Sequence, residues 1–351
     1  MSAQPNMSGE VCLNRQRGLT LIELMVAIVI GLILTAGVLQ IFIGSQQTYR
    51  FQESLSRIQE NGRFALETLA RDLRGADYRG CGGHSTELNT ILKGGFSEDY
   101  GFGGEGLRGH TYNGGWTPAL DAELAAQDPD QDSDIIRAFT ADGAGVRIID
   151  QNFKNANLDL EPGGGDRFNE GDIVWATDCR TATEFQITNV QQDATKLVHA
   201  SNPTPPPGNQ SPPQLPPYTG GQVLSFNARA FYVAPSASDA SNEPALFRLD
   251  RGGTPQELVE GVERMSLMFG EDTSGNRQVN RYRTAEEIES DDAWSNVVAV
   301  RVSLLVRGRD ENVTEDPQAI SFPPGSPVQT FDDRRLRQVF TTTVGIRNRL
   351  Q

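Results

Sequence analysis

A single acidic residue lies inside the most apolar stretch of this sequence. Residues 15–43 read RQRGLTLIELMVAIVIGLILTAGVLQIFI, and Glu23 is the one charged residue after Arg17. A carboxylate in the apolar part of a membrane helix costs about 3 kcal/mol or more unless it meets a partner. Glu23 therefore pairs with a positive group, or it lies close enough to the membrane surface to be hydrated, as in a simple signal-anchor helix.

The residue types that usually carry catalysis form no arrangement typical of an active site. The three histidines, His84, His110 and His199, are scattered, and we expect each of them on the surface. The sequence contains no G-x-S-x-G, no H-E-x-x-H and no cysteine beside a base motif. GFGGEG at 101–106 lacks the preceding strand and the following helix of a phosphate loop. We therefore predict a protein that is not an enzyme and uses no cofactor.

Carboxylates alternate between Asp128 and Asp134, as in the first half of a calcium-binding loop. Such a loop also needs a glycine at its sixth position and a glutamate at its twelfth, where this sequence has Ser133 and Phe139. We expect a solvated acidic loop and no metal site, with a calcium loop as the alternative.

The element that positions Glu23 is predicted to be a membrane helix. Residues 24–43 carry no charge, and about 20 residues at 1.5 Å each cross the roughly 30 Å core of a bilayer. Arg15 and Arg17 flank the N-terminal side, while polar residues such as Gln46 and Gln47 follow the apolar run. The positive-inside rule then leaves the short N-terminus in the cytoplasm and places everything beyond residue 44 on the other side of the membrane.

The small residue that invites cleavage lies before the apolar run, whereas a secretory signal peptide is cut after it. Arg17 and Gly18, followed by LTLIELMVAIVI, resemble the class III signal of type IV prepilins and the related pseudopilins. The resemblance implies that a prepilin peptidase removes the leader, residues 1–18, between Gly18 and Leu19. It also implies that Leu19 is N-methylated and that Glu23 pairs with the N-terminal amine of a neighbouring subunit.

The helical pattern continues beyond the membrane. Apolar residues recur at steps of three and four from Phe51 to Leu73, and charged residues occupy the other side of the helix. We predict one helix of about 80 Å over residues 19–74. Its 19–43 part crosses the membrane or fills the filament core, and its amphipathic 44–74 part carries a sheet on the apolar stripe.

The rest of the chain is typical of an α+β fold, in which the long helix packs on an antiparallel β-rich head at 75–351. The glycine-rich residues 75–116 are predicted to be loop, and the proline-rich residues 203–217 a polyproline-like surface spacer. Strands are predicted at 135–140, 146–149, 172–176, 183–190, 223–233, 245–249, 262–269, 298–306 and 340–346.

The chain is acidic, with a formal net charge of −15, and loss of the leader would remove one acidic and two basic residues. An acidic surface argues against nucleic acid or anionic lipid as a partner of the head. Arg334, Arg335 and Arg337 form a small positive cluster, which we interpret as the solvated edge of a strand.

Three cysteines are present, and Cys12 lies in the leader, so a cleaved chain keeps only Cys81 and Cys179. In an oxidising compartment we predict that these two form a disulfide, with two free thiols as the alternative. Closing a loop of about 100 residues stabilises a fold by about 4–5 kcal/mol in the chain-entropy model.

Later segments narrow the resemblance to the PilW family of minor pilins. The similar segments are QENGRFALETLARDLRGADYRGC at 59–81, GDIVWATDCRTATEFQITNV at 171–190, NVVAVRVSLLVRGR at 296–309 and VFTTTVGIRNRL at 339–350. The resemblance implies a subunit that joins other minor pilins and the major pilin on the inner-membrane assembly platform. It further implies a place at the pilus tip, with a tip adhesin as a possible neighbour, and support for twitching motility, adhesion and DNA uptake.

Two other classes of protein remain open. A J-type pseudopilin of a type II secretion system would share the helix, Glu23 and a β-rich head. A single-pass receptor with a periplasmic sensor domain would keep its N-terminus uncut and would not depend on prepilin peptidase.

Overall fold

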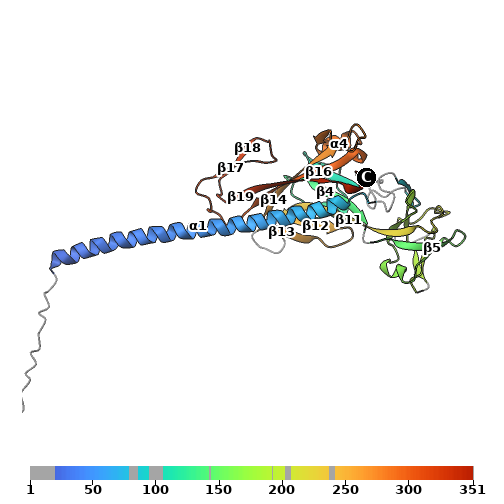
Figure 1. Cartoon of the computed structure of the whole chain (residues 1–351), viewed down its shortest axis with the longest axis horizontal. Helices are drawn as coiled ribbons and strands as arrows, with labels where there is room; N and C mark the ends of the chain where they lie inside the picture. Colours follow the sequence, from blue (N-terminus) through green and yellow to red (C-terminus); the bar gives the residue numbers. More distant parts are fainter. Residues whose placement is uncertain are drawn as a thin grey trace, which may run out of the picture. The chain divides into compact units, whose positions relative to one another are not determined.

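The computed structural model describes residues 20–78, 86–94, 106–141, 144–191, 193–201, 207–236 and 242–350. The chain divides into two units, Met1–Gln52 and Glu53–Gln351. One long helix, α1 (Leu21–Gly75), runs through the described part of the first unit and begins the second (Figure 1).

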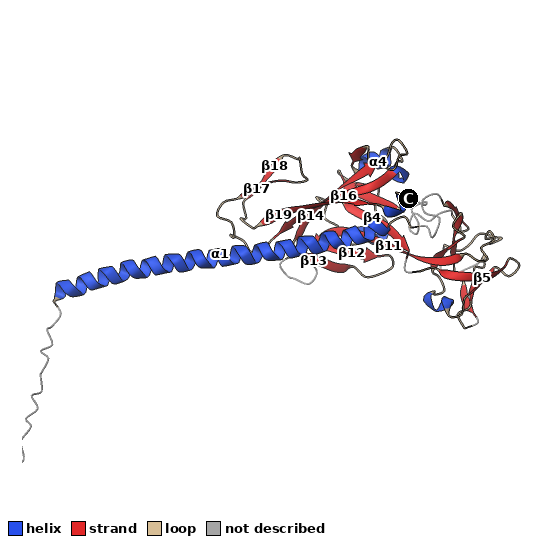
Figure 2. Ribbon diagram, viewed as in Figure 1, coloured by secondary structure: helices blue, strands red, loops and turns tan. Residues whose placement is uncertain are grey.

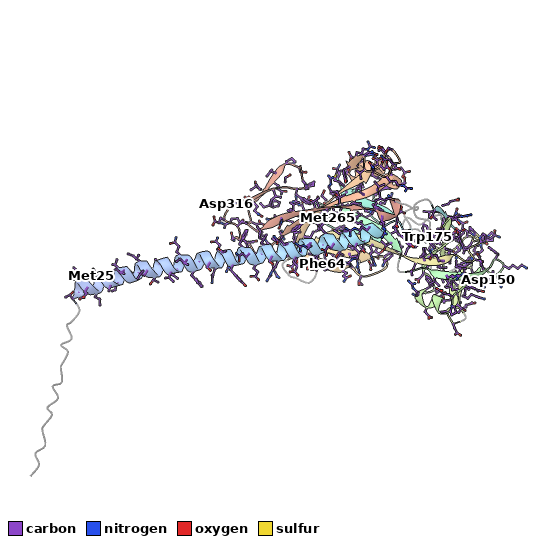
Figure 3. The ribbon with its side chains drawn as sticks, viewed as in Figure 1. Met25, Phe64, Asp150, Trp175, Met265 and Asp316 are labelled. Atoms are coloured by element: carbon purple, nitrogen blue, oxygen red, sulfur yellow. The ribbon has the colours of Figure 1, made fainter. Side chains whose placement is uncertain are left out.

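In the first unit, every described residue is exposed. The side chains around Met25 stand out from the helix on all sides (Figure 3). By length and composition, this part of α1 can cross a membrane. Nothing in the described chain covers these apolar side chains, and an exposed apolar surface of this kind is typical of a site that contacts a membrane or another protein.

In the second unit, α1 buries one side of the helix. The buried side chains on that side recur at steps of three and four, and they are Ser54, Ile58, Gly62, Ala65, Leu69 and Leu73. This confirms the predicted stripe from Ile58 to Leu73, whereas Phe51, in the first unit, is 38% exposed.

A four-stranded antiparallel sheet packs against this side of α1. Its strands, in spatial order, are β15 (Arg281–Arg283), β14 (Val262–Glu271), β16 (Val297–Arg307) and β19 (Arg337–Gly345). The strands predicted at 262–269, 298–306 and 340–346 are therefore confirmed. A separate hairpin of β17 (Gln318–Ser321) and β18 (Val328–Phe331) precedes β19.

The larger sheet of the described chain has thirteen strands. They are β1 (Glu87–Thr90), β2 (Leu107–Tyr112), β3 (Trp116–Thr117), β4 (Ile135–Ala141), β5 (Val146–Asn152), β6 (Asn157–Leu160), β7 (Ile173–Thr177), β8 (Thr181–Gln186), β9 (Asn189–Gln191), β10 (Lys196–Val198), β11 (Gln222–Pro235), β12 (Pro244–Asp250) and β13 (Gln256–Glu260). The pairing of β1 with β8 is parallel, and the other pairs of this sheet are antiparallel.

The long strand β11 belongs to both halves of this sheet. Residues 222–225 pair with β7, whereas residues 226–231 pair with β4. Two short helices, α3 (Ala122–Ala125) and α4 (Ala285–Ser290), lie in connections, and strands make up most of the regular secondary structure of the unit (Figure 2).

Two large hydrophobic cores follow from this arrangement. The first joins the buried side of α1 to residues of β4, β11, β14, β16 and β19, with Phe269 and Trp294 packed edge to face at 5.0 Å. The second lies in the half of the sheet formed by β5 to β8 and β10, and it includes Phe185 and Tyr218. The predicted α+β class, one long helix with antiparallel sheets, is confirmed.

Three expectations about local structure were wrong. The glycine-rich residues 75–116 contain β1, β2 and β3 rather than loop alone. The strand predicted at 183–190 is two strands, β8 and β9, which residues 187–188 separate. The described part of the proline-rich segment is no spacer, because Asn209 and Leu215 are buried and Asn209 bonds to the backbone of Gln186.

Candidate functional site

Glu23 lies in the first turn of α1, three residues after Thr20, which caps the start of the helix. The backbone N–H of Glu23 donates to the hydroxyl oxygen of Thr20 at 3.3 Å and to the Thr20 carbonyl at 3.1 Å. A threonine three residues before a glutamate is the sequence of a capping box, and a carboxylate in the first turn is favoured by the helix dipole. We did not predict this capping role, although the T-x-x-E spacing signals it.

The carboxylate of Glu23 forms no ion pair with any residue that the structure describes. Its neighbours along the helix are exposed apolar side chains, such as Leu24 at 51% and Met25 at 58%. Any positive partner of Glu23 would therefore come from outside the described residues of this chain, such as residues 1–19, or from another chain. Gly18 and Leu19, the predicted processing residues, lie outside the described residues, so cleavage and methylation stay predictions.

Within the second unit, two glycines allow close packing between the Glu53–Gly75 part of α1 and the residues around it. A Cβ atom on Gly62 would lie 2.5 Å from the ring of Phe340 on β19, so this glycine lets helix and strand approach closely. Near the start of the unit, a Cβ on Gly308 would meet the Ser54 side chain in the same way. The amide of Asn61 adds a hydrogen bond to the Glu260 carbonyl at 3.0 Å.

The C-terminus of the chain closes the end of α1. The amide of Asn348 donates to the carbonyl oxygens of Gly75 and Ala76 at 3.3 and 2.9 Å. Carbonyl groups at the end of a helix have no partner within the helix, so these bonds satisfy them. Arg349 Nε lies 2.7 Å from Asp77 Oδ2, and both side chains are 1% exposed. The closing IRNRL segment thus holds the turn that follows the helix.

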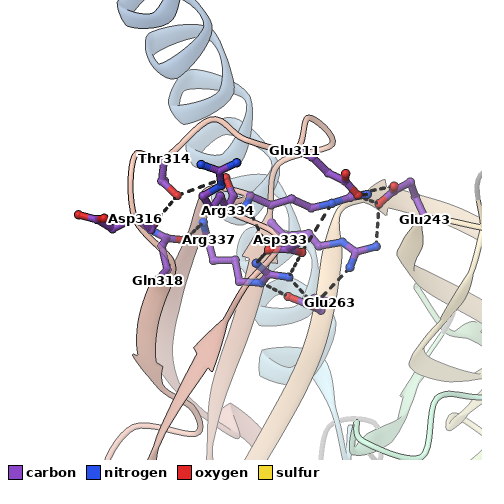
Figure 4. A network of polar contacts seen from close by, with 11 residues as sticks. Glu243, Glu263, Glu311, Thr314, Asp316, Gln318, Asp333, Arg334 and Arg337 are labelled. Carbon is purple, nitrogen blue, oxygen red and sulfur yellow. Dashed lines mark hydrogen bonds and ion pairs between the residues drawn. The ribbon is translucent and has the colours of Figure 1, made fainter.

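A network of buried ion pairs surrounds the arginines predicted to be a solvated edge (Figure 4). Arg335 Nη1 lies 2.8 Å from a carboxylate oxygen of Glu243, and Arg337 Nε lies 2.6 Å from Glu263 Oε2. Arg337 also pairs with Asp333 at 2.6 Å, which lowers the pKa of Asp333 to about 2. The prediction of a solvated edge was wrong for Arg335 and Arg337, because the acidic partners of this cluster lie up to 92 residues away in the sequence.

The two described histidines, His110 and His199, lie in the interior of the second unit. His110 and His199 are each 2% exposed, so the prediction of surface positions was wrong for both. Burial lowers the pKa of each to about 4, which leaves both rings neutral at pH 7. His84 lies outside the described residues.

The prediction of a solvated acidic loop holds for part of the segment 128–134: Asp128 and Asp132 are exposed, whereas Ser133 and Asp134 bond to the backbone of β14. The carboxylate of Asp134 accepts a hydrogen bond from the backbone of Leu267 at 2.7 Å, and the Ser133 hydroxyl accepts one from Met265 at 3.0 Å. Asp132 lies 3.5 Å from Arg264. In the part of the chain that the structure describes, no group of three or more His, Cys, Asp or Glu side chains could hold a metal ion.

Of the two cysteines in the predicted disulfide, Cys179 lies within the described residues. Cys179 lies in the turn between β7 and β8 with a φ of 75°, and its backbone N–H donates to the Thr177 hydroxyl at 3.2 Å. Cys81 lies outside the described residues. The pairing of Cys81 with Cys179 stays a prediction.

Two protein-family models match the chain. The model of the type IV pilus-assembly protein W, PilW, matches residues 230–348, and the prokaryotic N-terminal methylation motif matches residues 13–39. No curated protein matches. One solved structure, the type IV-like pilin TTHA1219 from Thermus thermophilus, is similar at 11% identity over 84% of this chain and 99% of that chain, with a TM-score of 0.33. The structural similarity is weak, and the likeness of this chain to type IV pilus proteins rests on the two family models.

Proposed function

We propose that this chain, which carries a pilus-assembly protein W domain behind a prepilin methylation motif, is a minor pilin that helps other minor pilins to prime assembly of a type IV pilus. The joint presence of the two signatures on one chain is the observation that carries the proposal. The methylation motif alone is shared with pseudopilins, whereas the second model describes a pilus-assembly protein. In this role the protein is a structural subunit without chemistry of its own.

The exposed apolar half of α1 supports a single membrane crossing before assembly and a place in the filament core afterwards. With Arg15 and Arg17 on the N-terminal side, the leader lies in the cytoplasm, where prepilin peptidase cuts between Gly18 and Leu19. The acidic β-rich head then lies in the periplasm and, after assembly, on the cell surface. A tip position, with a role in twitching motility, adhesion and DNA uptake, follows from the same proposal.

A clean deletion tests this function against the secretion alternative. We expect loss of surface pili and twitching motility with normal secretion of exoenzymes. The reverse pattern would identify a type II secretion pseudopilin. An unchanged strain, together with a full-length N-terminus on the mature protein, would favour a membrane receptor.

The role of Glu23 needs a pair of variants, because the side chain has two possible functions. Glu23→Gln keeps a hydrogen-bonding side chain at the third helical position but removes the charge that pairs with an amine. Glu23→Ala removes both functions. We expect normal leader cleavage and reduced incorporation into pili for both variants, as judged by immunoblots of sheared pili and of membranes.

If Glu23→Gln were incorporated normally while Glu23→Ala failed, capping of α1 rather than pairing with an amine would explain the residue. Normal incorporation of both variants would exclude both capping and pairing with an amine as the role of Glu23. Leader cleavage, read from the N-terminal sequence, controls for loss of membrane insertion.

A further inference from the structure

One edge of the four-stranded sheet is unprotected over most of its length. Folded proteins blunt such edges with short strands, charges, prolines or bulges. β15, at one edge, has three residues and carries two arginines, Arg281 and Arg283. β19, at the other edge, has nine residues without proline or a break in register; its one charged residue is Arg337 at its start, which is buried in ion pairs, and residues 341–343 are all threonine. Within the described chain, β19 pairs with no strand other than β16, and the Gln318 side chain accepts a hydrogen bond from the Arg337 N–H at its start, so the open part of the edge begins after Arg337.

A groove of about 700 Å³ lies between this strand and α1. Its apolar lining comes from Leu66, Ala70 and Phe340, and Gln338 and Thr342 add polar groups from β19. The Phe340 side of β19 faces the helix, since the ring of Phe340 packs on Gly62. A strand added beside β19 would lie about 4.8 Å beyond it, and every second side chain of that strand would point to the α1 side.

Three arginines line the α1 wall of the groove. Arg63, Arg71 and Arg74 are exposed, and none forms an ion pair with any of the residues described. The one carboxylate beside them is Glu67. In a protein with a net charge of −15, such a row of unpaired positive charges is a local exception. Positive charges along a partner site attract a partner of opposite charge.

The unpaired strand and the arginine row select the same kind of occupant. We propose that the groove binds an extended acidic segment of another protein chain, which adds as a strand to β19 and places alternate carboxylates against Arg63, Arg71 and Arg74. Backbone hydrogen bonds to β19 provide the affinity of such a complex, and the side-chain pockets provide its specificity. This site goes beyond the proposed pilus function and can be tested without it.

The probe is a peptide of nine residues, the length of β19, that alternates threonine and glutamate. Its binding to the full chain in detergent micelles is measured by fluorescence anisotropy, and amide exchange over residues 337–345 is measured by mass spectrometry. We expect slower exchange of alternate β19 amides with the acidic peptide. A matched peptide with lysine in place of glutamate should not bind.

A triple variant, Arg63→Gln, Arg71→Gln and Arg74→Gln, tests the positive wall. Exposed ion pairs change an equilibrium by up to about fivefold each, so we expect about tenfold weaker peptide binding. The matched control is the double variant Arg50→Gln, Arg57→Gln. Both arginines lie on the same helix outside the groove lining, so this variant should bind the peptide as the wild type does. Peptide with N-methylated backbone amides separates strand addition from charge attraction and should also bind weakly.

Several outcomes would overturn the proposal. One is no binding of the acidic peptide up to about 1 mM, a range in which weak complexes are still detected. Binding without protection of β19 amides, or equal binding of the N-methylated peptide, would show a surface that attracts anions without adding a strand. Equal binding of a short oligothymidine would point to general polyanion binding. A triple variant that melts earlier but binds peptide normally would show that the arginines only stabilise the end of α1.

Discussion

Replacing Arg349 with methionine should destabilise the second unit by about 3–5 kcal/mol, because it removes the guanidinium that pairs with the buried carboxylate of Asp77. Both side chains of this ion pair are 1% exposed, and Nε and Oδ2 lie 2.7 Å apart. Arg349 Nη1 also donates to the carbonyl oxygens of Trp294 and Val297, which would lose a donor. Methionine keeps an unbranched apolar stem, so the change removes charge and hydrogen bonds more than volume.

Tryptophan fluorescence reads this loss from the second unit alone, because Trp116, Trp175 and Trp294 all lie in it. Unfolding entropy is about 2.1 cal/mol/K per residue, which gives about 0.6 kcal/mol/K for a unit of this size. A loss of 3–5 kcal/mol then lowers Tm by about 5–8 °C. The assay is thermal unfolding of the full chain in detergent micelles at pH 7.

The matched control is Arg57→Met, which removes an exposed ion pair with Glu53 on the same helix. These side chains are 68% and 45% exposed, and a pair of this kind stabilises a helix by about 0.3–0.5 kcal/mol. The double variant Asp77→Asn, Arg349→Met should recover part of the loss, because it also removes the buried negative charge that Arg349 faced. A Tm for Arg349→Met within about 1 °C of the control would refute the reasoning from burial.

Three further changes test other parts of the structure. Gly62→Ala should cost about 1–2 kcal/mol, because its Cβ would lie 2.5 Å from the Phe340 ring, and Gly44→Ala, with nothing within 4 Å, should leave the Tm of the second unit unchanged. Equal Tm values for the two variants would contradict the close approach of α1 to β19. Burial raises the pKa of Glu184 to about 7, so the folded state binds its proton more tightly than the unfolded state and stability falls as pH rises from about 4.5 to 7. That fall amounts to about 3 kcal/mol from this group, and Glu184→Gln should flatten it in melts from pH 5 to 8, whereas parallel profiles of variant and wild type would exclude the effect. Cys81 and Cys179 should resist alkylation until reduced, and ready labelling of both in the native protein would rule out their disulfide.

The long helix and the last strands could be predicted because their burial follows a local period. The stripe from Ile58 to Leu73 recurs at helical steps, and β16 and β19 lie where apolar and polar residues alternate along the sequence. In these elements, each residue's side of the helix or strand depends on its own position in the chain. No distant partner has to be known.

The glycine-rich region misled the prediction because glycine there has a packing role. Gly109 lies inside β2, and a Cβ on it would strike the ring of Phe269. Gly106 has a φ of 69° and packs on Asp77 in the same way. A single sequence does not distinguish a glycine that makes a turn from one that makes room for a distant side chain.

Long-range charge pairing was equally hidden. Arg335 and Arg337 are a basic cluster in the sequence, but Glu243, just before β12, and Glu263, in β14, neutralise them from 92 and 74 residues away. Conversely, the arginines on the groove wall of α1 look like the wet side of an amphipathic helix, and they remain unpaired among the described residues. The spacing of arginines along the sequence does not show whether distant carboxylates neutralise them. That depends on which strands the fold places side by side.

The two halves of α1 pose opposite physical problems. From Leu21 to Gln52 the helix has no cover of its own in the described chain, so its stability in water depends on lipid or on other subunits. From Glu53 onward the same helix is fastened to its sheet, by close packing at Gly62 and by the Asp77–Arg349 pair at its end. In the proposed role, a subunit that enters a filament through an apolar helix needs this second kind of attachment, because a force on the helix otherwise reaches the head only through the single covalent connection after Gly75. Arg349→Met should therefore reduce incorporation of the protein into pili in cells, although the apolar half of α1 and its Glu23 are unchanged.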